Sequence, residues 1–328
     1  MKLFRKTRAL AALAAIAMLA GCGSAATQTE ETADAYKIGV LQYADHPSLD
    51  NCVEGFRQGL KSEGVAADID VQSAKADDAN DTQIAQQFAS DGKDLVCGVA
   101  TPSAQACYNA CFERGIPVVF NAVSDPVAAN LAKSETEAME GITGVSDKLP
   151  VEAQLALIRE IMPEAKTIGI LYTTSEANSV STIKEYEEKV GEYGFELVAE
   201  GITNAADIPQ AADILVEKVD CISNMTDNTV VANLPVLIEK ATAKGIPVFG
   251  SEEEQVGNGC VASAGIDYIE LGRKAGVIAA RVLKGEDIAA IPFETMTESK
   301  ITINPDAAAA IGLELPQSVT DRAEVKAG

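Results

Sequence analysis

The sequence predicts an α/β fold of two similar lobes, each a parallel β-sheet flanked by helices. From residue 36 onward, short apolar runs alternate with longer amphipathic runs, which is the pattern of βαβ units in a parallel sheet. Two segments also recur at an offset of 130 residues: 38–41 (IGVL) returns as 168–171 (IGIL), and 114–118 (RGIPV) as 244–248 (KGIPV). Two repeats at one spacing indicate two lobes of one design rather than a continuous sheet. A cleft is expected between them.

The individual elements follow from this alternation. In the first half, the apolar runs predict strands at 37–43, 68–73, 95–100 and 117–121, and the amphipathic runs predict helices at 49–63, 81–91 and 103–114. In the second half, strands are predicted at 167–172, 196–199, 221–225 and 247–251, and helices at 180–193, 208–219 and 230–244. Each half therefore supplies enough strands for a sheet of its own.

Residues 1–21 have the pattern of an export signal rather than of a folded element. Four cationic residues precede an apolar run of about twelve residues, which is too short for a bilayer core that needs about twenty. Residues 19–22 (LAGC) resemble a bacterial lipobox, which implies cleavage before Cys22 and a diacylglycerol on its sulfur. The alternative is an ordinary signal followed by a chance cysteine. Residues 22–35 are small, polar and acidic, as expected of a flexible tether.

The protein is therefore expected to be exported and lipid-anchored to the outer face of the cytoplasmic membrane, the periplasmic side if an outer membrane exists. Six cysteines follow Cys22, and an even number in an oxidising compartment permits up to three disulfides. Cys97 and Cys221 lie in apolar strand-like runs, where the alternative is a buried thiol. The six are Cys52, Cys97, Cys107, Cys111, Cys221 and Cys260.

Composition narrows the function. Of 328 residues, 49 are acidic and 26 basic, and the formal net charge of −23 argues against a nucleic-acid partner. A single histidine excludes a multi-histidine metal site and paired imidazole catalysis. The chain has no GxSxG elbow, no GxxxxGK[ST] phosphate loop and no GxGxxG after the first strand. No catalytic residue, metal or cofactor is predicted.

Polar clusters follow the predicted strands. Because ligands of open α/β sheets collect beyond the carboxyl ends of the strands, these clusters together predict a binding site in the cleft. The alternative for each cluster alone is helix capping by Ser, Thr, Asp and Asn in ordinary loops. The clusters lie at 43–46, 101–103, 121–125, 173–179, 226–228 and 251–252.

The chemistry of these clusters points to a zwitterion. Thr101 and Ser103 begin a helix with Pro102 in its first turn, an arrangement that suits a carboxylate. The opposite charge, for an ammonium group, would come from Asp125, Glu176, Asp227 or Glu252. An apolar pocket could be lined by aromatic residues near strand ends, although core packing is the alternative for each; these are Tyr43, Phe120, Tyr172 and Phe249. His46 either contacts the ligand or caps a helix.

Motifs along the whole mature chain resemble the ABC transporter substrate-binding protein family that includes the TrpX-type binders. The motifs are 37–42 (KIGVLQ), 46–50 (HPSLD), 100–105 (ATPSAQ), 122–127 (AVSDPV), 176–179 (EANS), 226–230 (TDNTV) and 265–268 (GIDY). The resemblance implies a type I periplasmic-binding fold, in which two Rossmann-like lobes close about a hinge on a small ligand. It also implies delivery of that ligand to a membrane permease and its ATPase. A monomer is expected.

The resemblance further implies that the chain crosses between the lobes. The N-terminal lobe would comprise 36–147 plus 264–291, the C-terminal lobe 148–263 plus 292–318, and 319–328 a tail. A helix at 268–284 would return to the first lobe and a strand at 300–304 to the second.

TrpX-type members bind aromatic amino acids, so Trp, Phe or Tyr is the expected ligand, with a branched aliphatic amino acid, a sugar or a nucleoside as alternatives. A ligand-sensing receptor lobe is the alternative function. By resemblance the ligand carboxylate would lie at Thr101 and Ser103. Residues 251–253 (SEE) replace the Ser-Asp-Glu of the family, which leaves the ammonium partner open. The full predicted site is Tyr43, His46, Thr101, Ser103, Ser124, Asp125, Glu176, Asn178, Ser179, Asp227, Asn228 and Glu252.

Overall fold

A computed structural model of the chain describes residues 35–326. The expected signal, the lipobox with Cys22 and nearly all of the tether lie outside the described residues. None of the helices described is long and apolar enough to cross a membrane.

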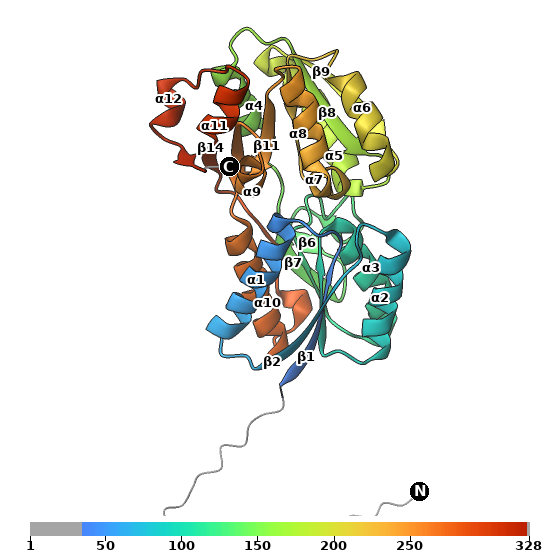
Figure 1. Cartoon of the computed structure of the whole chain (residues 1–328). Helices are drawn as coiled ribbons and strands as arrows, with labels where there is room; N and C mark the ends of the chain where they lie inside the picture. Colours follow the sequence, from blue (N-terminus) through green and yellow to red (C-terminus); the bar gives the residue numbers. More distant parts are fainter. Residues whose placement is uncertain (1–34, 327–328) are drawn as a thin grey trace, which may run out of the picture. The chain divides into compact units, whose positions relative to one another are not determined.

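The first sheet is entirely parallel, and its strand order is β13-β7-β4-β3-β1-β2. Figure 1 labels β1, β2 and β7 of this sheet. The strands are β1 (Tyr36–Gln42), β2 (Ala67–Ser73), β3 (Leu95–Val99), β4 (Val118–Asn121), β7 (Ile142–Ser146) and β13 (Glu294–Thr295). A short antiparallel hairpin of β5 (Ala132–Ser134) and β6 (Glu137–Ala138) lies between β4 and β7 in the chain.

The second sheet has the order β15-β14-β12-β11-β10-β8-β9 and is parallel except where β14 meets β12. Its strands are β8 (Thr167–Thr173), β9 (Glu196–Ile202), β10 (Cys221–Ser223), β11 (Val248–Glu252), β12 (Ala262–Ile266), β14 (Lys300–Ile303) and β15 (Glu324–Val325).

The two sheets share one topology, which confirms the predicted pair of lobes. Both follow the order second, first, third, fourth, fifth, with β2-β1-β3-β4-β7 in one and β9-β8-β10-β11-β12 in the other. The repeated sequence segments fall on β1 and β8, and on the approach to β4 and β11, which hold equivalent places. Each sheet has a point at which strand order reverses, where ligands of such folds bind.

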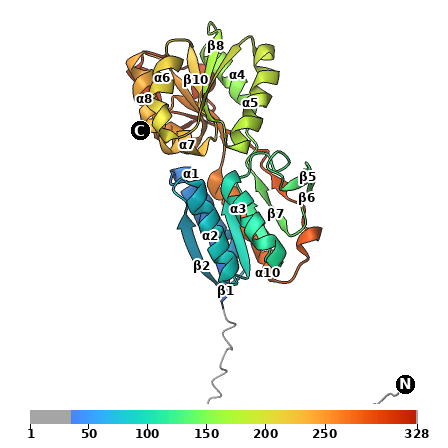
Figure 2. The ribbon, with the colours of Figure 1, turned by 90° about the vertical axis from the view of Figure 1, so that its right-hand side faces the viewer.

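Helices flank both sheets. Those packed with the first sheet are α1 (Pro47–Ser62), α2 (Asp78–Ser90), α3 (Thr101–Cys111) and α10 (Tyr268–Leu283). Figure 2 shows α2 and α3 together on one face of this sheet. Those of the second lobe are α4 (Val151–Ile161), α5 (Ala177–Lys189), α6 (Ile208–Leu215), α7 (Asn228–Ala232), α8 (Leu234–Ala243), α9 (Glu253–Gly257), α11 (Pro305–Ala310) and α12 (Gln317–Thr320).

Helices α1 and α10 pack in close backbone contact through glycines. A Cβ added at Gly55 of α1 would lie 2.1 Å from the carbonyl oxygen of Ile269, and one at Gly272 of α10 would lie 2.2 Å from that of Cys52. Gly59 and Gly276 meet one turn further along. The first turn of α1 and the start of α10 are thereby fixed to each other.

Several elements differ from the sequence expectation. The strands β7 and β12 and the helix α4 were not predicted, and the helix predicted at 230–244 is two helices. It breaks at Asn233 because Pro235 stands in the first turn of α8 and has no N–H to continue the preceding helix.

The C-terminal region also differs. Residues 292–318 were expected in the C-terminal lobe, but Phe293 packs into the first core, where its ring lies 5.7 Å from that of Phe120. This anchors β13 to β7, so the chain returns to the second sheet after Thr295. Part of the expected tail forms β15, which pairs with β14.

The six cysteines of the described part of the chain are free and buried. Cys97 and Cys221 are therefore buried thiols rather than disulfide partners, as the alternative prediction stated, and so are the other four. Burial raises the pKa of the Cys221 thiol to about 12 and that of Cys111 to about 11, so these groups pack as small neutral side chains.

Candidate ligand-binding site

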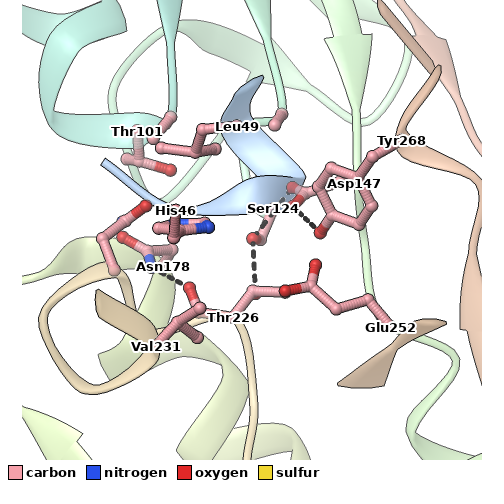
Figure 3. Close-up of a pocket in the computed structure, with 13 residues that line it drawn as sticks. His46, Leu49, Thr101, Ser124, Asp147, Asn178, Thr226, Val231, Glu252 and Tyr268 are labelled. Atoms are coloured by element: carbon pink, nitrogen blue, oxygen red, sulfur yellow. Dashed lines mark hydrogen bonds between the residues drawn. The ribbon is translucent and has the colours of Figure 1, made fainter. Parts of the chain in front are cut away.

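A narrow pocket lies where the carboxyl ends of the two sheets face each other (Figure 3). The first lobe contributes residues that follow β1, β3, β4 and β7, namely His46, Leu49, Ala100, Thr101, Ala122, Ser124 and Asp147. Residues that follow or end β8, β10, β11 and β12 complete it, namely Asn178, Thr226, Asn228, Val231, Glu252 and Tyr268. The space accessible to the centre of a water molecule is only about 10 Å³. Entry of a ligand the size of an amino acid therefore requires the walls to move apart.

Three lining side chains present buried polar atoms that have no hydrogen-bond partner in the described part of the chain. These atoms are both ring nitrogens of His46, Oγ1 of Thr101 and Oδ1 of Asn178. A buried polar atom that lacks a hydrogen bond is costly, and its usual explanation is a water or ligand at that point. Burial lowers the pKa of His46 to about 4, so the ring is neutral and offers one donor and one acceptor.

The start of α3 is built to face an anion. Ala100 precedes the helix at a φ of 76°, a left-handed conformation that is strained for alanine, and no side chain caps the first turn. The N–H groups of that turn are thus left for another partner, and the helix dipole favours a negative one. Ala122, beyond β4, has a similar φ of 61°.

The pocket also contains two buried acidic side chains, Asp147 and Glu252. Asp147 accepts hydrogen bonds from Oγ of Ser124 at 3.0 Å and from the hydroxyl of Tyr268 at 2.8 Å. Burial raises its pKa, and these two donors oppose the rise. Glu252 likewise has its pKa raised to about 8, by burial first and then by the neighbouring Glu254 carboxylate. Among the described residues that line the pocket there is no Lys or Arg to neutralise either group.

Direct contacts join the lobes at the rim of this pocket. Ser48 of α1 donates to Oε1 of Glu252 at 2.5 Å, and Ser124 and Thr226 place their hydroxyls 3.4 Å apart. Outside the pocket, Asn51 of α1 donates to Glu254 of α9 at 2.5 Å. Separation of the lobes must break all three contacts.

Six of the twelve predicted site residues line the pocket: His46, Thr101, Ser124, Asn178, Asn228 and Glu252. The structure places the other six elsewhere. Asp227 is fully buried beneath the site, where it accepts hydrogen bonds from the N–H and Oγ1 of Thr173, from Oγ of Ser179 and from the N–H of Val230. It caps α7 and ties that helix to β8, and Ser179 is used as one of its donors.

Glu176 has a similar internal role. Its carboxylate accepts from the N–H and Nδ2 of Asn228 at 3.0 and 2.7 Å and from the N–H and Oγ1 of Thr229 at 3.1 and 2.9 Å. Burial, reinforced by the charge of Asp227, raises its pKa to about 7. Glu176 therefore holds Asn228 in place at the pocket wall.

The last three predicted residues likewise do not line the pocket. Ser103 donates to the carboxylate of Asp81, and Tyr43 donates to Asp78 at 2.8 Å. Asp125 accepts from the backbone of the turn that follows it. Asp125 thus has the local turn-forming role that polar residues take after strands, whereas Tyr43 and Ser103 bond to carboxylates of α2.

Seven lining residues were not predicted: Leu49, Ala100, Ala122, Asp147, Thr226, Val231 and Tyr268. Ala122 and Thr226 lie within the polar clusters that the sequence pointed out. Asp147 and Tyr268 could have been found by the same rule, since they follow β7 and β12, had those strands been recognised.

The comparisons with known proteins agree with this arrangement. The sequence profile described as ABC transporter substrate binding protein matches residues 37–326. The chain belongs to this family. The resemblance seen in the sequence is confirmed, and the family is one of binding proteins of ABC transporters rather than enzymes.

Members of the ABC transporter substrate binding protein family include close relatives of this chain. A protein of Clostridioides difficile named "Tyrosine-binding protein" is 37% identical, and the alignment covers 93% of this chain and 91% of the relative. A crystal structure from Streptococcus pneumoniae in complex with L-Trp is 34% identical with a TM-score of 0.84, covering 88% of this chain and 99% of that one. The ligand-free, open structure of a substrate binding protein with adhesive properties from Clostridium difficile is 38% identical with a TM-score of 0.67, covering 89% and 100%.

Proposed function

We propose that this protein captures an aromatic amino acid outside the cytoplasmic membrane and delivers it to the permease and ATPase of an ABC importer. The observation that carries the proposal is the pairing of opposite receptors in one pocket. The uncapped start of α3 with Thr101 suits a carboxylate, and the carboxylate of Asp147, which no cation compensates among the described residues, suits an ammonium group.

The remaining wall suits the side chain of such a ligand. Leu49, Ala100, Ala122 and Val231 supply apolar surface, and the small alanines leave room for a flat ring. His46 and Asn178 add polar atoms that can meet a phenol or an indole N–H. The relatives whose names mention tyrosine or L-Trp support this choice of ligand class.

Capture is proposed to proceed by closure of the lobes. The narrow pocket requires opening for ligand entry, and three side-chain contacts between the lobes must break when it opens. The lobes resemble the L-Trp complex more closely than the open relative, with TM-scores of 0.84 and 0.67 at comparable identity. The closed form would then be recognised by the permease.

Anchoring through a lipid on Cys22 is part of the proposal, and it rests on the LAGC motif. Replacement Cys22→Ser should release the protein from the membrane fraction and abolish labelling by radioactive palmitate. Retention of both properties would argue against the anchor.

Ligand binding can be measured without interference because the chain contains no tryptophan. With excitation of indole, a change in fluorescence on mixing tryptophan with purified protein reports the ligand alone, and tyrosine and phenylalanine can be tested by competition. We expect saturable binding of at least one aromatic amino acid, with leucine, glucose and adenosine as controls. Binding of glucose or adenosine alone would overturn the assignment of an amino acid.

A further inference from the structure

Asp147 and Tyr268 lie where the chain passes between the lobes. Asp147 follows β7 directly, at the crossing that leads into α4 of the second lobe. Tyr268 is the first residue of α10, at the crossing that returns from β12. Figure 3 shows both side chains at the same end of the pocket, joined through Asp147 to Ser124.

The contacts of Asp147 suit a charged carboxylate that can pair with a cationic group of the ligand. Each carboxylate oxygen accepts one hydroxyl, Oδ1 from Ser124 at 3.0 Å and Oδ2 from Tyr268 at 2.8 Å. Asp147 is 3% exposed, and no Lys or Arg of the described residues forms an ion pair with it. Two neutral donors fix its orientation and support its negative charge without neutralising it.

Glu252 is used differently. Its Oε1 already accepts from Ser48 of the opposite lobe at 2.5 Å and from Gln255 at 2.9 Å. The nearby Glu254 carboxylate disfavours a second negative charge, and the pKa of Glu252 rises to about 8, so this group carries a proton at neutral pH in the closed form. Glu252 therefore serves as a contact between the lobes.

We infer that Asp147 receives the ammonium group of the ligand and that Tyr268 is the positioning residue that holds Asp147 for it. The inference rests on the proposed function and deepens it. It places both receptors on the first lobe, Thr101 for the carboxylate and Asp147 for the ammonium group, so the ligand docks there before the second lobe closes. Burial keeps the Tyr268 hydroxyl protonated and thus a permanent donor.

A double-mutant cycle tests this role. Tyr268→Phe removes the hydroxyl and keeps the ring, and we expect it to weaken tryptophan binding about tenfold. In the Asp147→Asn background, where the charge is already lost, the same change should alter affinity by less than about twofold. Tyr186→Phe is the matched control, because Tyr186 is also buried and its hydroxyl bonds to Ser223 at 2.9 Å, away from the pocket.

Ligand analogues distinguish this positioning role from a purely structural one. Tryptamine keeps the ammonium group and indolepropionic acid lacks it, so Tyr268→Phe should weaken tryptamine binding as it weakens tryptophan binding and leave indolepropionic acid unaffected. An equal loss from Tyr268→Phe with and without Asp147 would overturn the inference, as would no loss at all. Failure of the unaltered protein to bind any aromatic amino acid would instead overturn the proposed function.

Discussion

At the scale of single residues, two hydroxyls two positions apart on α3 have opposite roles. Thr101 is 1% exposed and its Oγ1 has no hydrogen-bond partner among residues 35–326, whereas Ser103 is fully buried and donates to Asp81. The first is a free hydrogen-bonding group in the pocket, and the second satisfies a buried carboxyl whose pKa burial raises to about 6. Of these two hydroxyl residues, Thr101 is thus expected to affect ligand binding and Ser103 to affect stability.

We therefore expect Thr101→Val to weaken tryptophan binding about tenfold while leaving the unfolding free energy unchanged. Ser103→Ala should do the reverse, lowering the unfolding free energy by about 1–3 kcal/mol because Asp81 loses its donor, with affinity altered less than about twofold. Fluorescence titration and urea unfolding measure the two quantities. Equal loss of affinity in both variants would contradict this division.

Only half of the predicted site residues line the candidate pocket, because the sequence shows which residues follow strands but not which way their side chains turn. Asp227 and Glu176 were chosen as ammonium partners for their charge, yet both cap backbone N–H groups inside the second lobe. Asp147 carries the charge at the pocket and was missed. The deciding factor is the local hydrogen-bonding demand of each helix start, which only the fold reveals.

At the scale of elements, the contact of α1 with α10 positions much of the pocket. Ser48 and Leu49 lie in the first turn of α1, Tyr268 begins α10, and the glycines one to two turns away hold the two helices in contact. The backbone approach leaves no room for a methyl group. A change in this packing should therefore alter ligand affinity as well as the stability of the core.

Gly272→Ala tests this coupling. Its Cβ would lie 2.2 Å from the carbonyl oxygen of Cys52, so the helices must separate. We expect the unfolding free energy to fall by about 3 kcal/mol and tryptophan affinity to fall as Tyr268 shifts. Gly191→Ala is the control, since no atom lies within 4 Å of the added methyl group. Wild-type stability and affinity in Gly272→Ala would show that the contact is dispensable.

Element prediction succeeded where apolar runs were bounded by clear turns and failed where they were short or interrupted. The strand β7 (ITGVS) contains a glycine and ends in polar residues, and β12 (ASAGI) is composed largely of small residues. Both are buried along their whole length, but their low content of large apolar residues hid them. The family resemblance implied the crossings, but without these strands Asp147 and Tyr268 could not be recognised as residues at the carboxyl ends of the two sheets.

At the scale of the whole molecule, the repeated lobe explains why the site is shared. Each lobe presents the carboxyl ends of its strands, and the two edges face each other across the pocket. The receptors are not repeated with the fold, however. The first lobe holds Thr101 and Asp147, whereas the second supplies Asn178 and Asn228, both held by the buried carboxylate of Glu176. The proposed mechanism therefore assigns ligand recognition to the first lobe and closure to the second.

Closure should be linked to protons through Glu252. In the closed form this side chain is buried between Ser48 of α1 and Gln255 of α9, with the carboxylates of Glu254 and Asp147 nearby, and its pKa is raised from 4.5 to about 8. Opening of the lobes removes the contact with Ser48 and exposes the carboxyl to water, which returns its pKa toward the ordinary value. Closing therefore takes up a proton between these two pKa values.

This proton uptake determines how ligand binding depends on pH. Above the ordinary pKa of Glu252, affinity declines as pH rises toward 8, because closing requires uptake of a proton that has become scarce. We expect tryptophan to bind roughly tenfold or more tightly at pH 6 than at pH 8. Glu252→Gln, which keeps an acceptor for Ser48 without titrating, should flatten this dependence. Calorimetry in buffers of different ionisation enthalpy measures the proton uptake directly, and a pH dependence that survives in Glu252→Gln would assign the proton to another group.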